Sequence, residues 1–79
     1  MKRIVVPHLG EGIEEATVAF WHVNPGDRVK EDDDIVELVT DKATFHVPAG
    51  MSGLVQEIRV PKGQDVKIGE TLALIEEND

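Results

Sequence analysis

An internal repeat relates the two halves of this 79-residue chain. Sliding the second half back onto the first aligns strand-like runs and Pro/Gly turns in the same order. The aligned pairs are Val18 with Val55, Val23 with Val60, Gly26 with Gly63, Val29 with Val66, Lys30 with Lys67, Ile35 with Leu72 and Leu38 with Ile75. Such a repeat predicts two small antiparallel sheets that pack face to face about an approximate two-fold axis.

The local pattern agrees with an all-β fold, because short runs rich in β-branched residues alternate with turn residues. No window shows sustained helical periodicity. The segment Asn24-Pro25-Gly26-Asp27 is a strong turn signal, with Pro25 and Gly26 at the centre of a type II turn. The expected strands are residues 2–6, 16–23, 28–30, 35–40, 45–47, 54–60, 65–67 and 71–76.

The repeat also assigns side chains to faces. Trp21 and Val23 align with Ile58 and Val60, so we expect both to point into the core. Phe20 aligns with Glu57 and is therefore expected to face solvent, where it would be a candidate contact for a partner.

The length and the net charge of the chain disfavour several classes of function. The chain is expected to form one domain over residues 1–79, with a thin core and no room for an enclosed catalytic cleft. The formal charge of −8 and pI near 4.7 disfavour nucleic acid and anionic membranes as partners. No apolar run approaches a membrane span, and the start of the chain lacks a signal-peptide core, so we expect a first strand at a native N-terminus. Without cysteine there is neither a disulfide nor a thiolate metal site.

The stretch Thr40-Asp41-Lys42-Ala43 lies almost at the midpoint of the chain, between the runs 35–39 and 45–47. Two strand patterns separated by a short polar pair predict a β-hairpin with Lys42 at its tip. Period-two alternation then places Phe45 and Val47 on the core face and leaves the lysine in solvent. An amine on a rigid, exposed turn is accessible to a modifying enzyme.

Five sequence blocks in order make the whole chain resemble a known family. It is similar to the lipoyl domain of the acyltransferase subunit of 2-oxo-acid dehydrogenase complexes, within the biotinyl/lipoyl attachment family. The blocks are Leu9-Gly10-Glu11-Gly12-Ile13, Trp21 followed by Pro25-Gly26-Asp27-Arg28-Val29, Thr40-Asp41-Lys42-Ala43, Gly53-Leu54-Val55-Gln56-Glu57-Ile58 and Gly69-Glu70-Thr71-Leu72. The resemblance implies a flattened β-barrel sandwich of two four-stranded antiparallel sheets with quasi-two-fold symmetry.

The resemblance also implies roles for particular residues. Lys42 would be the site of amide-linked lipoic acid, with Asp41 and Ala43 as the flanking recognition residues. A loop beside the hairpin would help the decarboxylase subunit to recognise the domain. That loop is Gly10, Glu11, Gly12 and Ile13.

The function implied is that of a carrier and not of an enzyme. The lipoyl group on Lys42 would form an arm of about 14 Å that shuttles acyl groups and electrons between active sites of the complex. The implied partners are the 2-oxo-acid decarboxylase subunit, dihydrolipoyl dehydrogenase, the acyltransferase core, and a lipoate ligase or lipoyl transferase. We expect a monomeric domain, cytoplasmic or in the mitochondrial matrix of a eukaryote, that is the first module of a longer dihydrolipoyl acyltransferase.

Two alternative functions remain at this point. A biotin carrier domain of a carboxylase has a similar fold, but it typically presents its lysine between two methionines, whereas Asp41 and Ala43 flank Lys42. An unmodified structural module would have no use for the lysine at all.

Other patterns point to no catalytic or metal site. The segment 10–15 begins like a dinucleotide-binding fingerprint but has Glu15 in place of the third glycine. The acidic run 31–34 lacks the spacing of a calcium loop, and His8, His22 and His46 lack metal-ligand spacing.

Overall fold

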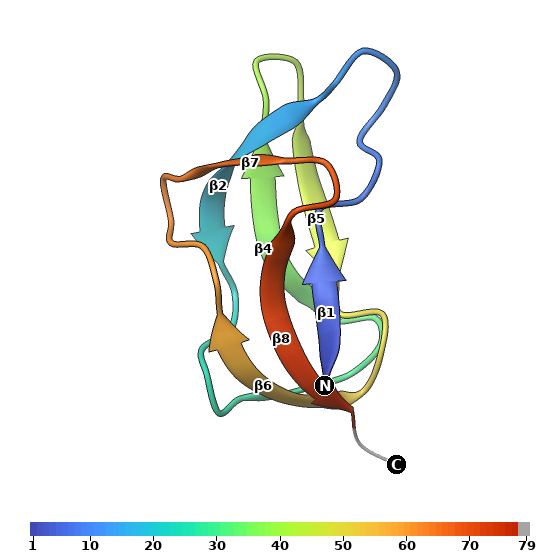
Figure 1. Cartoon of the computed structure of the whole chain (residues 1–79), viewed down its shortest axis with the longest axis vertical. Coiled ribbons are helices and arrows are strands. Elements are labelled where there is room, and N and C mark those ends of the chain that lie inside the picture. The colour runs from blue at the N-terminus through green and yellow to red at the C-terminus, as the bar shows by residue number, and fades with distance from the viewer. Residues whose placement is uncertain (78–79) are drawn as a thin grey trace.

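The computed structural model describes residues 1–77. The repeat would also align Lys42 with Asp79, which lies outside the described residues. The chain forms two antiparallel four-stranded sheets, which confirms the predicted fold class (Figure 1). The strands are β1 (Lys2–Val5), β2 (Glu15–Trp21), β3 (Arg28–Val29), β4 (Asp34–Val39), β5 (Thr44–Pro48), β6 (Gly53–Ile58), β7 (Asp65–Lys67) and β8 (Thr71–Glu77). No helix in the described range is long and apolar enough to cross a membrane.

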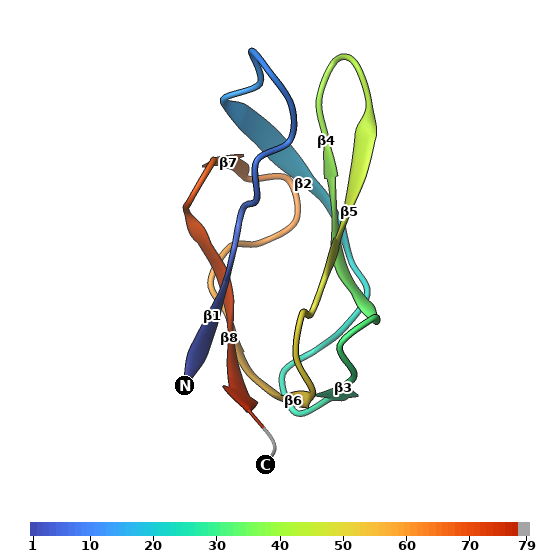
Figure 2. The same ribbon diagram turned by 90° about the vertical axis from the view of Figure 1, so that its right-hand side faces the viewer.

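The two sheets do not coincide with the two halves of the repeat. One sheet has the order β1-β8-β6-β3 and the other β5-β4-β2-β7. The short strand β3 of the first half therefore pairs with β6 of the second, and β7 of the second pairs with β2 of the first. Seen edge-on, the sheets form two layers that face one another (Figure 2). Each half completes the sheet of the other, so neither half is a folding unit by itself.

Equivalent residues of the two halves occupy equivalent places in the sheets. Val18 lies opposite Leu38 in the β2–β4 pair, and Val55 lies opposite Ile75 in the β6–β8 pair. In each pair the register shifts directly after the valine. A β-bulge inserts one extra residue and so reverses which side chains point inward beyond it. The repeat thus extends to the irregularities of the sheets.

The bulge determines which side chains at the end of β2 point into the core and which face solvent. Strict alternation from Val18 would bury Phe20, but Phe20 is 49% exposed and Val23 is buried. Trp21 is half-buried against the core, and its indole N–H donates a hydrogen bond of 2.9 Å to the carbonyl of Val60. The expected faces are therefore confirmed for Phe20 and Val23, and the Trp21 ring lies at the margin of the core because its N–H reaches a loop carbonyl.

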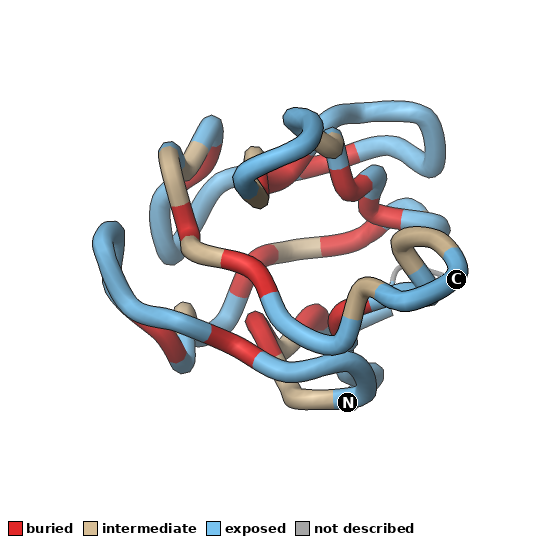
Figure 3. Tube along the Cα trace, turned by 90° about the horizontal axis from the view of Figure 1, so that it is seen from above, coloured by how far each residue is buried: buried red, intermediate tan, exposed pale blue. Residues whose placement is uncertain are grey.

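The hydrophobic core lies between the sheets and forms one cluster. Buried positions alternate with more exposed ones along β2, β5 and β7, whereas β4 and β8 each contain two consecutive buried residues; Figure 3 marks the buried positions along the chain. Aliphatic side chains fill the core, and the described residues place no buried polar side chain there. The largest fully buried side chains are Ile35, Leu38, Leu72, Ile75, Val6, Val18, Val36, Val55 and Val66.

Matching turns also recur in both halves. Gly26 has φ of 95°, and the N–H of Asp27 donates to the carbonyl of Asn24 at 3.0 Å. Gly63 has φ of 92° in the turn whose closing bond runs from the N–H of Gln64 to the carbonyl of Pro61 at 3.2 Å. A positive φ at the third residue is the mark of a type II turn, which confirms the expected role of Gly26.

The domain is elongated, with extents of 37 × 21 × 17 Å. The connection between β4 and β5 and the loop between β1 and β2 form one end of the long axis, and the N-terminus lies toward the other end beside the end of β8 (Figures 1 and 2). The central hairpin is therefore separated from the start of the chain by almost the whole length of the molecule.

Candidate functional site

The predicted hairpin is formed by β4 and β5, and its strands are fixed to the core. Leu38 lies opposite Phe45 and Val39 opposite Thr44 in the register. Leu38 is fully buried, and Phe45 is half-buried against the core. Because both sides of the hairpin are anchored immediately below the tip, the tip residues project from a rigid support.

β4 ends at Val39 and β5 begins at Thr44, so the tip is the four-residue connection Thr40-Asp41-Lys42-Ala43. The N–H of Thr40 donates to the carbonyl of Ala43 at 2.8 Å. The hydroxyl of Thr40 accepts from the N–H groups of Lys42 at 3.1 Å and Ala43 at 3.2 Å, and donates to the Ala43 carbonyl at 3.3 Å. This side chain therefore takes part in closing the turn, a role that the sequence analysis missed. The known tendency of Ser and Thr to cap turns through their hydroxyl groups was the signal that could have found it.

The side chain of Lys42 is exposed to solvent. None of the ion pairs within residues 1–77 involves it. Asp41 and Ala43 are exposed on either side of it. The amine is thus accessible and not engaged in a salt bridge, as a residue awaiting covalent modification would be.

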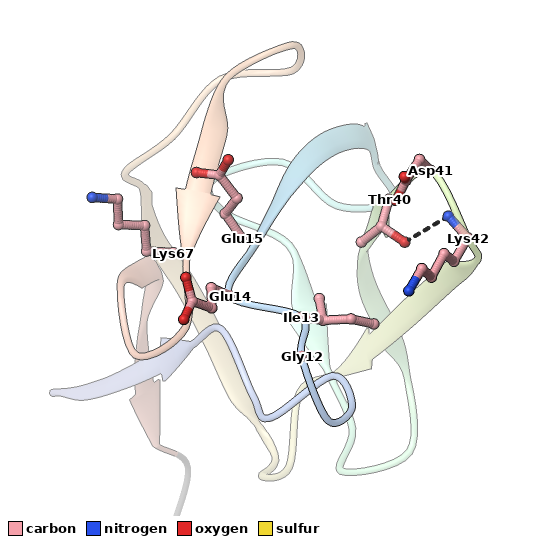
Figure 4. Close-up of a pocket in the computed structure, with 8 residues that line it drawn as sticks. All are labelled: Gly12, Ile13, Glu14, Glu15, Thr40, Asp41, Lys42 and Lys67. Atoms are coloured by element: carbon pink, nitrogen blue, oxygen red, sulfur yellow. Dashed lines mark hydrogen bonds between the residues drawn. The ribbon is translucent and has the colours of Figure 1, made fainter.

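A hollow of about 480 Å³ opens between the tip and the loop that precedes β2. Gly12 and Ile13 from the loop line it together with Asp41 and Lys42 from the tip, and Figure 4 shows the loop and the tip on opposite sides of it. The structure therefore brings these four predicted residues together. Gly10, Glu11 and Ala43 do not line the hollow, although the carbonyl of Gly10 accepts a hydrogen bond of 3.1 Å from the N–H of Ile13 and so shapes the loop.

Four further residues line the hollow and were not predicted: Thr40, Glu14, Glu15 and Lys67. Glu15 and Lys67 are paired across β2 and β7, so they reach the site through the strand exchange between halves, which no local pattern shows. Three carboxylates and two amines line the hollow in all. Acylating the amine of Lys42 would remove one of the two positive charges and leave the rim more acidic.

The chemistry available at this site is that of an amine nucleophile. The residues lining the hollow include no imidazole, thiol or serine hydroxyl that could form a nucleophile–base pair of the usual kinds. An open, polar hollow with an exposed lysine fits a covalently attached group that projects into solvent.

Two of the three histidines lie beside the same glutamate, outside this site. His46 Nε2 lies 3.0 Å and His22 Nε2 lies 3.8 Å from the same Glu37 Oε1, on the outer face of the β5-β4-β2-β7 sheet. The ring of His22 makes an edge contact with Phe20, at 5.1 Å between centroids. No group of three or more possible ligands in residues 1–77 is arranged to hold a metal ion. The sequence spacing did not reveal that His46 lies beside Glu37, because that contact depends on the register of β4 and β5.

A family model described as "Biotin-requiring enzyme" matches residues 2–75. Among curated proteins, the lipoamide acyltransferase component of the branched-chain alpha-keto acid dehydrogenase complex of Bacillus subtilis is 37% identical over 76 residues, covering 96% of this chain and 18% of the relative. The succinyltransferase component of the 2-oxoglutarate dehydrogenase complex of Rickettsia conorii is 41% identical over 75 residues, covering 95% and 19%. The chain thus spans about a fifth of the length of these relatives.

Among solved structures, the solution structure of the lipoyl domain of the 2-oxoglutarate dehydrogenase complex from Azotobacter vinelandii is similar over the whole of both chains. It superposes with a TM-score of 0.80 at 38% sequence identity. The similarity therefore covers fold and sequence together, and it extends to each end of the matched chain.

Proposed function

The chain belongs to the biotin/lipoyl attachment family and is a lipoyl domain, and from this premise we propose that Lys42 is the residue that carries its lipoic acid. Lipoyl domains of the acyltransferase components carry covalently attached lipoic acid on a lysine. The observation that supports Lys42 is its place, exposed and free of any described ion pair, at the tip of a hairpin fixed to the core. Attachment joins the lysine Nζ to the lipoyl carboxyl carbon through an amide bond.

The chain contributes position and access to this function. When bound, the lipoyl group would supply a dithiolane that is reductively acylated, passes the acyl group to an acceptor to leave a dithiol, and is reoxidised to the disulfide by a partner. The β4–β5 hairpin holds the point of attachment at one end of the 37 Å long axis. The hollow beside it leaves the base of the arm open to partners on the side of Gly12 and Ile13. Tethering converts diffusion between active sites into transfer at high effective concentration.

The domain itself is a carrier, and we assign no catalytic residue to it. The relatives are components of 2-oxo-acid dehydrogenase complexes. By analogy the partners are the decarboxylase subunit, dihydrolipoyl dehydrogenase, the acyltransferase core and a lipoate ligase or lipoyl transferase. Recognition by the decarboxylase is assigned to the Gly10–Ile13 loop, and recognition by the attaching enzyme to Asp41 and Ala43. A cytoplasmic or matrix location remains a prediction.

Biotin is the alternative cofactor, since the matching family model is described by it. The lipoyl-domain structure and the acyltransferase relatives favour lipoic acid. Both cofactors would be attached to the same lysine, so the identity of the attached group has to be measured directly.

The test is to produce residues 1–79 in cells that contain both a lipoate-attaching and a biotin-attaching enzyme, and to measure the intact mass. We expect one lipoyl group on the wild-type chain, none on Lys42→Arg, and an unchanged group on Lys62→Arg, which alters an exposed turn of the other half. Both variants should keep the wild-type melting temperature. A lipoyl group retained on Lys42→Arg would overturn the site, and a biotinyl group on the wild-type chain would overturn the cofactor.

A further inference from the structure

The turn that presents Lys42 differs from the tightest hairpin turns, because the four residues 40–43 connect β4 to β5. Those turns are of types I′ and II′, which need a positive φ at one or both central residues. No residue other than glycine has a positive φ in the described part of the chain, so Asp41 and Lys42 both have negative φ. A four-residue connection is most often built around a type I turn, which has negative φ, and the side chain of a residue within it can support it through hydrogen bonds.

The hydroxyl of Thr40 supplies that support. It accepts hydrogen bonds from the amides of Lys42 and Ala43, the two N–H groups that flank the Cα atom of the lysine (Figure 4 shows the first). The amide of Ala43 lies beyond the paired residues of β4 and β5, and it donates to the side chain of Thr40. The direction in which Lys42 leaves the backbone is thus tied to one oxygen atom that belongs to another residue.

We propose that Thr40 is a positioning residue for the modification of Lys42, which it holds in the orientation that the attaching enzyme must bind. The inference rests on the proposed function. In the reaction, the lysine Nζ attacks the carboxyl carbon of an activated lipoyl donor, such as an acyl adenylate or a carrier thioester. The new amide bond forms as the bond to the adenylate or thiolate breaks, and the amine proton goes to solvent.

The proposal makes a specific kinetic prediction. Without the hydroxyl, the tip samples several conformations, and only a fraction of them fits the attaching enzyme. The apparent affinity of an enzyme falls in proportion to the fraction of its substrate in the competent conformation. Losing hydrogen bonds of ordinary strength lowers that fraction about tenfold. We therefore expect the KM of the attaching enzyme for the domain to rise about tenfold, with kcat little changed.

The test compares Thr40→Val, Thr40→Ser and Thr44→Val as substrates of a lipoate-attaching enzyme at saturating donor. Valine keeps the shape and strand propensity of threonine but has no acceptor, and serine keeps the hydroxyl. Thr44 is a matched control, because it is exposed on the same hairpin and is also near Lys42. We expect the raised KM for Thr40→Val alone, with rescue by Thr40→Ser, and no loss of melting temperature in any variant.

Amide hydrogen exchange provides a readout that does not depend on modification. In the unmodified Thr40→Val domain, the amides of Lys42 and Ala43 should exchange faster than in wild type, while the amides of β4 and β5 keep their rates. Unchanged exchange and a wild-type KM for Thr40→Val, or a failure of Thr40→Ser to rescue, would overturn the proposal. A wild-type chain that is never lipoylated would instead overturn the proposed function, so the two failures are distinguishable.

Discussion

The two ends of this molecule are related by the same two-fold arrangement of strands but are closed differently. At one end β4 continues through Asp41 and Lys42 into β5; at the other, β8 pairs with β1, the first strand of the chain. Ile4 and Val47 occupy equivalent buried places, opposite Ala73 and Val36 respectively. The sheets thus form equally well with a covalent turn or with a pair formed by distant segments.

The difference shows that a strand pair in this fold does not require a covalent turn. A strand pair without a turn serves the opposite end, where Lys2 lies opposite Ile75. The turn at Lys42 is therefore best explained by what it presents, and the proposed function lies where the symmetry of the chain is broken. Substitutions at equivalent positions of the two halves test how far the equivalence extends.

The largest effect is expected in the core. Leu38 and Ile75 are equivalent, and both are fully buried. Truncation of either to alanine should lower the free energy of unfolding by about 2–5 kcal/mol, through lost burial and a cavity. Urea denaturation monitored by circular dichroism measures the free energy of unfolding of each variant. If the alanine variants do not fold, the milder changes Leu38→Val and Ile75→Val allow the same comparison. A large loss in one half and a negligible loss in the other would show that the halves are not packed alike.

A smaller and unequal effect is expected at the equivalent pair Ala16 and Gly53. A Cβ atom at Gly53 would clash with the backbone carbonyl oxygen of Glu76 and crowd the side chain of Ile75. Gly53→Ala should therefore destabilise the domain by about 1–3 kcal/mol through overpacking. The reverse change, Ala16→Gly, should cost about 1 kcal/mol through chain entropy. An unfolding midpoint for Gly53→Ala equal to that of the wild type would contradict the close approach of β6 and β8.

The smallest effect is expected at Gly26 and Gly63, which have φ of 95° and 92°. A Cβ atom would meet nothing within 4 Å at either position, so the penalty is conformational alone. Each alanine substitution should lower the free energy of unfolding by about 1 kcal/mol, since left-handed backbone is unfavourable for a residue with a Cβ atom. Equal shifts in the midpoint would support equivalent turns; a shift at one position only would mean that the turns differ in solution.

Much of the fold was predictable because the signals were local or repeated. All eight strands lie where the β-branched runs predicted them, with bounds that differ by up to two residues. The outward position of Phe20 was also predictable from its alignment with Glu57. The alignment holds there because the bulge after Val18 recurs at the equivalent place after Val55. The exchange of β3 and β7 between halves was not predictable, because it is a long-range pairing of two short strands without a pattern of their own.

At the candidate site, the hairpin and its exposed lysine were predictable from the runs on either side. The convergence of Glu15 and Lys67 on the hollow was not, since it follows from the pairing of β2 with β7. The role of Thr40 was missed for a different reason: a threonine before a turn is also an ordinary strand residue, and the hydrogen bonds that its hydroxyl accepts from Lys42 and Ala43 are visible only in the structure.

The exchange of short strands between the halves affects which molecules an attaching enzyme can modify. Because each sheet needs strands from both halves, the domain should fold and unfold as an all-or-none unit, with no stable half-molecule that still displays the tip. An attaching enzyme that reads the shape of the tip then encounters either a finished domain or a shapeless chain. Attachment would in that case mark a molecule as having folded correctly.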